Sequence, residues 1–549
     1  MAVLIEEPSL PLYHPAKPLP FELVQHVAIF FEEKLHTQAL SLLLDSLSAH
    51  ADASTSTYIP SPQHLALAAT FLVHPSTTAR PKTTEEEEAP NVSLRLLRLV
   101  NSLVGPYNAQ LNTAFLFTHF ETSRHGGRRH ADDSALTERR KPLNLDRDID
   151  IDLAQSASVW SRAEDFWHAV GWAFNCSVLH PARWERWRVW LEFMCEILED
   201  DWSERLRRKE SEPSKKTIDG EGLEGSLIVQ YINNSMAGFG RNRRILRSIF
   251  ADGTTHFVNE FREVFHNEVK LSRKKTPNEK ENKKREAAVD IEADEYADFY
   301  LSSDYDTSSS TGGRESKRPR RSRAAAIKPG TGKSKSNIDS LPNPILPTAA
   351  LGDTTSLALR QRLLQLLSTV SEALPKHLME LQDLYHLFVE FIRPLPLPIY
   401  QSFVSPFALP HFTPAAQTTL CELLLFRLRE TAAPQSEKAY LDQAKLELCF
   451  LPYATATPSL SDNAKMSITL EALLILLADD NLLVVTDDTK RLTQTGIIRR
   501  AEKAQYETRK NQLARMSEDM EWSWLCESAE RLRFLVDEVI TGGSASTGS

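Results

Sequence analysis

The stretch that decides the fold runs from position 181 to 206 and reads PARWERWRVWLEFMCEILEDDWSERL. At about 100° per residue, its large apolar side chains share roughly half of a helix circumference. These side chains are Trp184, Trp187, Trp190, Leu191, Met194, Ile197, Leu198, Trp202 and Leu206. Pro181 suits the first helical position, where its missing N–H is not needed. So wide a stripe predicts a helix buried against more than one neighbour.

Amphipathic stretches recur on both sides of this segment, separated by proline and polar clusters. Ser61 followed by Pro62, and Asp353, are each predicted to cap the start of a helix. Prolines outnumber glycines by 30 to 19, which disfavours β-rich folds and glycine loops that hold nucleotide phosphates. The only convincing strand-like run is 482–486. The sequence therefore predicts an all-α protein with two helical bodies. An irregular stack of helical hairpins, resembling a solenoid, and a compact bundle both remain open.

The 549 residues are enough for at least two cores. We expect an N-terminal helical domain over 1–270, with polar insertions near 75–90 and 121–155. In 271–352, apolar side chains are too few to offset an ordering entropy of about 1–2 kcal/mol per residue. This stretch is predicted to be a disordered linker. A C-terminal helical domain over 353–541 and a flexible tail over 542–549 complete the predicted organisation.

Charge is distributed unevenly along the chain. The net charge is −10, but 271–352 holds 16 basic and 12 acidic residues, so the remainder carries −14. No secretory signal opens the sequence and no apolar run is long enough to cross a bilayer. The five cysteines form no C-x-x-C pair, which argues against a disulfide framework or a cysteine-rich zinc site. We expect a soluble intracellular protein.

The sharpest motif is a basic cluster at 317–323, KRPRRSR. Cations around a proline in an extended segment present their charge outward, as an import receptor requires. The sequence therefore predicts a nuclear import signal made of Lys317, Arg318, Arg320, Arg321 and Arg323. A nonspecific basic linker and a contact with DNA phosphates are the alternatives. Phosphorylation of the serines in 286–310 is a further means of masking this cluster.

A second basic group follows Gly240, where a helix is expected to begin. It comprises Arg241, Arg243, Arg244 and Arg247. One interpretation is an arginine-bearing turn that pairs with the acidic body. The other is a contact with a phosphate, a nucleic acid or an acidic partner, because free N–H groups and guanidiniums attract anions.

Several weaker patterns carry little chemistry. Asp148, Asp150 and Asp152 alternate with Ile149 and Ile151, which suggests a Mg²⁺ site or an edge strand for a small modifier protein. The histidines at 125 and 130 lack further metal ligands nearby. The run 330–334 lacks the first glycine of a phosphate-binding loop. No familiar catalytic motif appears, so we expect no catalytic residues, no metal and no cofactor.

These features favour a non-enzymatic nuclear scaffold or complex subunit that acts through protein–protein binding, in chromatin, chromosome maintenance or nuclear RNA processing. An acidic body suits protein partners better than nucleic acid, because it repels phosphates. The alternative is direct nucleic-acid binding through 314–335 and the turn from Arg241 to Arg247. A third hypothesis, an enzyme with a dispersed site, requires a concave pocket with convergent ionisable groups.

Overall fold

A computed structural model describes residues 13–49, 56–118, 149–211, 222–235, 240–270, 351–407, 411–436, 438, 440–506 and 512–539. Across these ranges helices dominate, which confirms the all-α prediction. The described part of the chain holds one small sheet, in which β1 (Ala16–Pro18) pairs in parallel with β2 (Thr57–Ile59).

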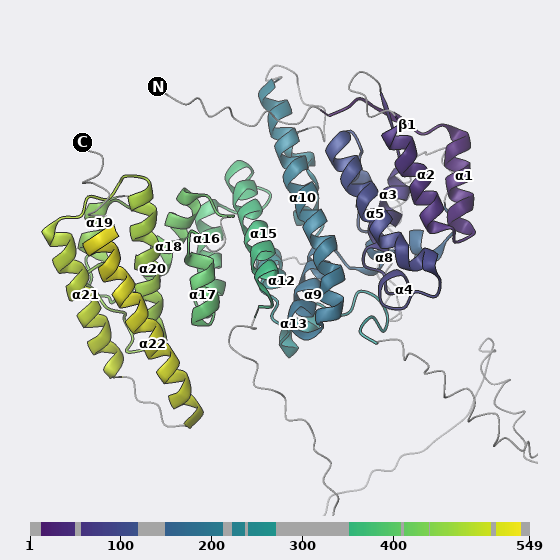
Figure 1. The fold of residues 1–549 in the computed structure, drawn as a ribbon. Helices are drawn as coiled ribbons and strands as arrows, with labels where there is room; N and C mark the ends of the chain where they lie inside the picture. The colour runs from purple at the N-terminus through teal and green to yellow at the C-terminus, as the bar shows by residue number, and fades with distance from the viewer. Residues whose placement is uncertain are drawn as a thin grey trace, which may run out of the picture. The chain divides into compact units, whose positions relative to one another are not determined.

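The helices that precede position 271 pack mainly on helices close to them in the chain, with α2 against α5, α3 against α5 and α9 against α10 (Figure 1). Their bounds are α1 Phe21–Glu32, α2 His36–Ser48, α3 Pro62–Phe71, α4 Pro75–Thr78, α5 Thr84–Leu103, α6 Leu111–Ala114, α8 Val159–Arg162, α9 Phe166–Leu179, α10 Pro181–Ser211, α11 Leu227–Asn233, α12 Arg241–Ile249 and α13 Thr255–Glu260. Two 3₁₀ turns, η2 Asp152–Ala154 and η3 Leu223–Gly225, lie between them.

The helices that follow position 350 also pack on helices close to them in the chain, with α16 on α18 and α20 on α21 and α22 (Figure 1). Their bounds are α15 Thr354–Ala373, α16 Leu381–Ile392, α17 Leu397–Val404, α18 Pro414–Leu428, α19 Gln443–Cys449, α20 Leu460–Asp479, α21 Asp487–Gln505 and α22 Gln512–Phe534, which continues as a π-helical turn, η5 Leu535–Val539.

The tryptophan helix lies where the sequence places it. Helix α10 begins at Pro181 and buries its four tryptophans; Trp187 and Trp190 are fully enclosed. Its neighbours include α9, α11 and α15, which explains the width of the apolar stripe. Leu206, at the end of that stripe, is instead exposed.

Two predicted helix starts are confirmed by their caps. Ser61 precedes Pro62 at the start of α3, and the Ser61 N–H donates to Nδ1 of His64 at 3.2 Å. At α15, the Asp353 carboxylate accepts the N–H of Ser356 at 2.7 Å. Both caps satisfy N–H groups that the first turn of a helix leaves unpaired.

The structure differs from the sequence prediction at two places. The acidic run 85–88, expected as a linker, forms the first turns of α5, and Pro90 lies inside this helix. Thr83 caps the helix, and acidic side chains are favourable near the positive end of the helix dipole. The run 482–486 connects α20 to α21 and forms no strand among the described residues.

Helices from both sides of 272–344 belong to one compact unit. Helix α15 packs against α10 and α12, and α16 also contacts α12. Arg360 of α15 is fully buried and donates to the carbonyls of Ile249 and Ala251, the latter at 2.9 Å. The predicted linker 271–352 lies outside the described residues except for its last two positions. In the described ranges, no helix has the length and apolar composition needed to span a membrane.

Candidate protein-binding surface

The predicted import signal, residues 317–323, lies outside the described residues. The same holds for Asp148 and for the histidines at 125 and 130. These predictions therefore stand as sequence-based hypotheses, and the structure bears on the second basic group.

The first two arginines of that group face α16 and the turn that precedes it. Arg241 donates from Nη2 to the His377 carbonyl at 2.7 Å. Arg243 forms an ion pair with Glu390 of α16, with both side chains about half exposed. These contacts join α12 to the part of the chain that follows position 350.

The other two arginines pair within the N-terminal helices. Arg244 is nearly buried and binds Asp165, the N-cap of α9, and also Glu164 at 3.1 Å. Arg247 forms two hydrogen bonds from Nη2 and Nε to the Glu260 carboxylate, each at 2.8 Å. All four arginines thus have partners inside the protein, and their positive charge is largely engaged.

The isoleucines at 149 and 151 belong to the core. Ile149 is only 3% exposed, and Ile151 packs against the same apolar cluster. The Ile149 carbonyl also accepts a hydrogen bond from the Gln155 amide at 3.2 Å. Because both isoleucines pack on the core, their side chains are not free to enter a partner's groove, which argues against the edge-strand hypothesis for this segment. Within the described ranges, no group of three or more metal-ligating side chains comes together.

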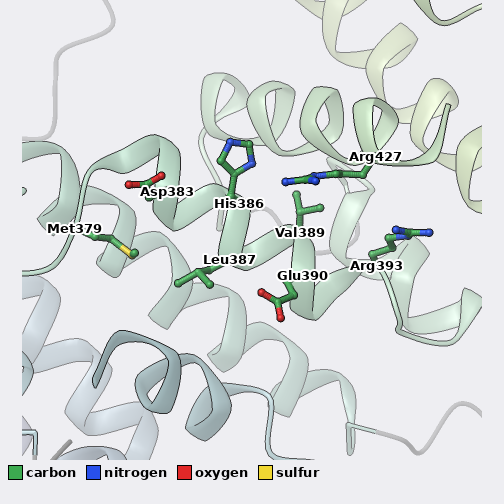
Figure 2. A pocket seen from close by; sticks show the side chains of 8 residues that line it. All are labelled: Met379, Asp383, His386, Leu387, Val389, Glu390, Arg393 and Arg427. Carbon is green, nitrogen blue, oxygen red and sulfur yellow. The ribbon is translucent and has the colours of Figure 1, made fainter. Parts of the chain in front are cut away.

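A pocket of about 540 Å³ lies between α16 and α18 (Figure 2). Figure 2 shows the Arg427 guanidinium of α18 reaching over Val389 towards His386, whereas Glu390 projects from the opposite side of α16. The pocket is lined by Met379, Asp383, His386, Leu387, Val389, Glu390, Arg393 and Arg427.

Some of the charged side chains around this pocket have ion-pair partners in the described part of the chain and others have none there. Glu390 pairs with Arg243, and Arg393 lies 3.6 Å from the Asp462 carboxylate. Arg427 is exposed and has no ion-pair partner among the described residues. The Nδ1 atom of His386 is buried without a hydrogen-bond partner within the same ranges. The unpaired Arg427 guanidinium beside the apolar side chains of this pocket could bind a carboxylate of a peptide.

Two further cavities have walls that are already paired or largely apolar. One, of about 500 Å³, lies between α10 and α15, where Arg362 and Glu199 form an ion pair at 2.6 Å. The other, of about 310 Å³, is lined by β1, the end of β2 and residues 108–110. Neither gathers an unpaired set of acid, base and nucleophile.

Burial also shifts the pKa values of several groups that line none of these cavities. Burial lowers the pKa of His64 and of His74 to about 4, and it raises the pKa of the Cys195 thiol to about 12. Burial also lowers the pKa of Arg500 to about 9, while its Nη1 donates to the Leu451 carbonyl at 3.3 Å. These groups serve packing and helix capping.

Exposed apolar side chains are concentrated in the part of the chain that follows position 400. Of the fourteen large apolar residues that are exposed in the described ranges, ten follow position 400. They are Phe407, Phe426, Tyr440, Leu448, Leu482, Val484, Ile498, Tyr506, Met520 and Phe534. Sequence reasoning missed these residues because the exposure of a side chain depends on which elements pack against it in the folded chain.

Phe426 of α18 and Leu448 of α19 are both exposed on helices that an ion pair joins, and we call these two residues the seam surface. Lys445 of α19 pairs with Glu422 of α18 at 2.6 Å, one turn before Phe426 and three residues before Leu448. The Arg429 guanidinium lies 4.7 Å from the centre of the Phe426 ring. Phe426 and Leu448 are each more than half exposed. Large exposed apolar side chains are typical of sites that a partner protein contacts.

Comparison of the chain with protein-family profiles, curated protein sequences and solved structures yields no match.

Proposed function

We propose that the protein is a non-enzymatic subunit of a nuclear assembly and binds other proteins through its C-terminal helices. The observation that carries this proposal is the concentration of exposed apolar side chains after position 400, above all the seam surface. Helix α18 also contributes Arg427, the residue after Phe426, to the pocket between α16 and α18. Apolar anchors beside an unpaired arginine are the usual energetic centre of a protein interface.

Charge favours a protein partner over nucleic acid. Outside 271–352 the chain carries a net −14, which repels phosphates over distances of about 8 Å at physiological salt. The four arginines of α12 are paired internally. Direct nucleic-acid binding therefore depends on 314–335 alone. That alternative predicts steep salt dependence and loss of binding when the basic residues of 314–335 become alanine.

The proposal is tested by affinity purification of the tagged full-length chain from nuclei, compared with a variant that carries Phe426→Asp and Leu448→Asp. We expect the variant to lose proteins that the wild type retains at equal expression. Phe21→Asp is the matched control, because Phe21 is equally exposed but lies on α1. An unchanged set of retained proteins in the seam variant would overturn the proposal.

The nuclear assignment has a separate test. Replacement of Lys317, Arg318, Arg320, Arg321 and Arg323 by alanine is expected to move a fluorescently tagged chain from nucleus to cytoplasm. Fusion of an independent import signal to the variant should restore nuclear fluorescence. Nuclear accumulation of the unfused variant would show that the cluster is not required.

A further inference from the structure

The segment 482–486 connects α20 to α21 outside any helix or strand, and the exposure of its side chains alternates. Leu482 is 60% exposed and Val484 is 70% exposed, whereas Leu483 between them is 7% exposed. This alternation is that of a strand with one face on the core and one face in solvent. We call 482–486 the edge segment.

On one side of the edge segment, the Gln443 side chain bonds to the backbone of Val484 as a neighbouring strand would. The Val484 N–H donates to Oε1 of Gln443 at 2.9 Å, and Nε2 of Gln443 donates to the Val484 carbonyl at 2.7 Å. In an extended chain the polar groups of successive residues point to opposite sides. The N–H and C=O groups of Leu483 and Val485 therefore point away from Gln443, and they have no hydrogen-bond partner among the described residues.

Both ends of the edge segment are anchored. The Leu482 N–H donates to the Leu477 carbonyl at 2.8 Å after Asn481 turns the chain with a φ of 56°. At the other end, Thr486 caps α21 by accepting the N–H of Thr489 at 3.2 Å. These contacts fix both ends of the segment before a partner binds, so less conformational entropy is lost on binding.

Acidic residues flank the edge segment on both sides. Asp479 and Asp480 precede it, Asp487 and Asp488 follow it, and all four side chains are exposed. Asp488 is engaged with Arg491 at 2.9 Å, which leaves most of the negative charge available. A partner that fits must offer an open strand edge, an apolar groove and basic side chains beside it.

We propose that the edge segment adds as a strand to the sheet of a small ubiquitin-like modifier. Leu482 and Val484 enter the apolar groove of the modifier, the backbone groups of Leu483 and Val485 pair with its edge strand, and the flanking aspartates face its basic rim. This inference rests on the proposed function, because it names one class of protein partner for the same C-terminal region. It uses a different surface from the seam, so the two are separable.

The test titrates an isotopically labelled small ubiquitin-like modifier with the full-length protein and follows its amide shifts by NMR. We expect shifts confined to one edge strand and the adjacent groove. Leu482→Ala with Val484→Ala should weaken binding at least about tenfold, which corresponds to about 1.4 kcal/mol. Asp479→Asn with Asp480→Asn should weaken it less and reduce its salt dependence. The matched control is Ile498→Ala, an exposed apolar residue on α21.

Absence of shifts with the wild-type protein would overturn the inference, as would unchanged affinity in the Leu482 and Val484 variant. Equal binding of labelled ubiquitin would show that the flanking charges do not select the modifier. Thermal unfolding of each variant verifies that the fold is retained. If the modifier fails to bind while the seam-dependent partners are still retained, only this inference fails and the proposed function stands.

Discussion

The indole Nε1 of Trp172 donates a hydrogen bond to Oε2 of Glu268 at 3.0 Å. The other carboxylate oxygen accepts the indole of Trp187 at 2.6 Å and Nε of Arg183 at 2.9 Å. Glu268 is 1% exposed, so its charge is removed from water and balanced by Arg183 and by these indoles. One acid thus ties α9 and α10 to the segment that follows α13.

Replacement of Glu268 by alanine is expected to lower the free energy of unfolding by about 3–5 kcal/mol, because it leaves the buried Arg183 guanidinium without a counter-ion and two indoles without an acceptor. Urea unfolding followed by tryptophan fluorescence measures this loss. The control is Arg98→Ala, which breaks an exposed ion pair with Glu196 and should cost less than about 1 kcal/mol. Equal effects of the two substitutions would contradict the role of Glu268.

Arg360→Leu should destabilise the contact between α15 and the turn after α12. The guanidinium is fully buried, and it is bonded to main-chain carbonyls rather than to a carboxylate. Each carbonyl left unpaired costs about 1–3 kcal/mol. We expect faster amide hydrogen exchange in α15, measured by mass spectrometry. Arg362→Leu, which breaks a partly exposed pair on the same helix, should leave the exchange of α15 close to that of the wild type.

Stability should fall with acid because two buried histidines cap helices in their neutral form. Nδ1 of His64 accepts the Ser61 N–H, and Nδ1 of His74 accepts the Ser76 N–H, each at 3.2 Å. Burial lowers both pKa values to about 4, against 6.5 for an unburied histidine. The unfolded chain therefore binds more protons, and stability is complete above pH 6.5 and is lost as the pH falls towards 4.

For His64 the expected loss is about 2 kcal/mol between pH 7.5 and pH 5. Urea unfolding at the two pH values measures it. His64→Asn should be less stable at pH 7.5 but should show a flatter dependence on pH. Parallel pH profiles for the variant and the wild type would mean that other groups control the acid response.

Gly496→Ala should destabilise α21, although alanine favours helices over glycine by about 1 kcal/mol. A Cβ at this position would lie 1.9 Å from the Leu451 carbonyl oxygen, so the helix has to move away from that segment. A lower melting temperature in differential scanning calorimetry is expected. Gln494→Ala, at an exposed position of the same helix, should leave the melting temperature unchanged or raise it. A rise with Gly496→Ala would show that the close approach is easily relaxed.

The sequence predicted the helices best where local chemistry determines them. Ser61 with Pro62 and Asp353 each carry the signal for a helix start within four residues, so no distant contact is needed. The run 85–88 was misread because acids before a proline are typical of a linker as well as of a first helical turn. Extended backbone at 482–486 was predicted, but its partner is the side chain of Gln443, which no strand pattern reveals.

The candidate surface was less accessible to sequence reasoning. The arginines of α12 are engaged by Asp165 and Glu390, 79 and 147 residues away along the chain, and no local pattern shows such pairs. The same limitation applies to Phe426 and Leu448. Each lies in an apolar stretch of sequence, and only the packing of the folded chain determines that its side chain is exposed.

The packing of α15 on α10 has an evolutionary consequence, because 80 residues of undescribed chain lie between α13 and α15 while these helices share one compact unit. The sequence predicts a disordered linker over 271–352, and the entropy of closing such a loop grows only as the logarithm of its length, so that doubling it costs about 0.6 kcal/mol. Insertions and deletions between the two halves of the fold are therefore nearly neutral for stability. Selection is free to rewrite regulatory signals there while the helical framework stays constant.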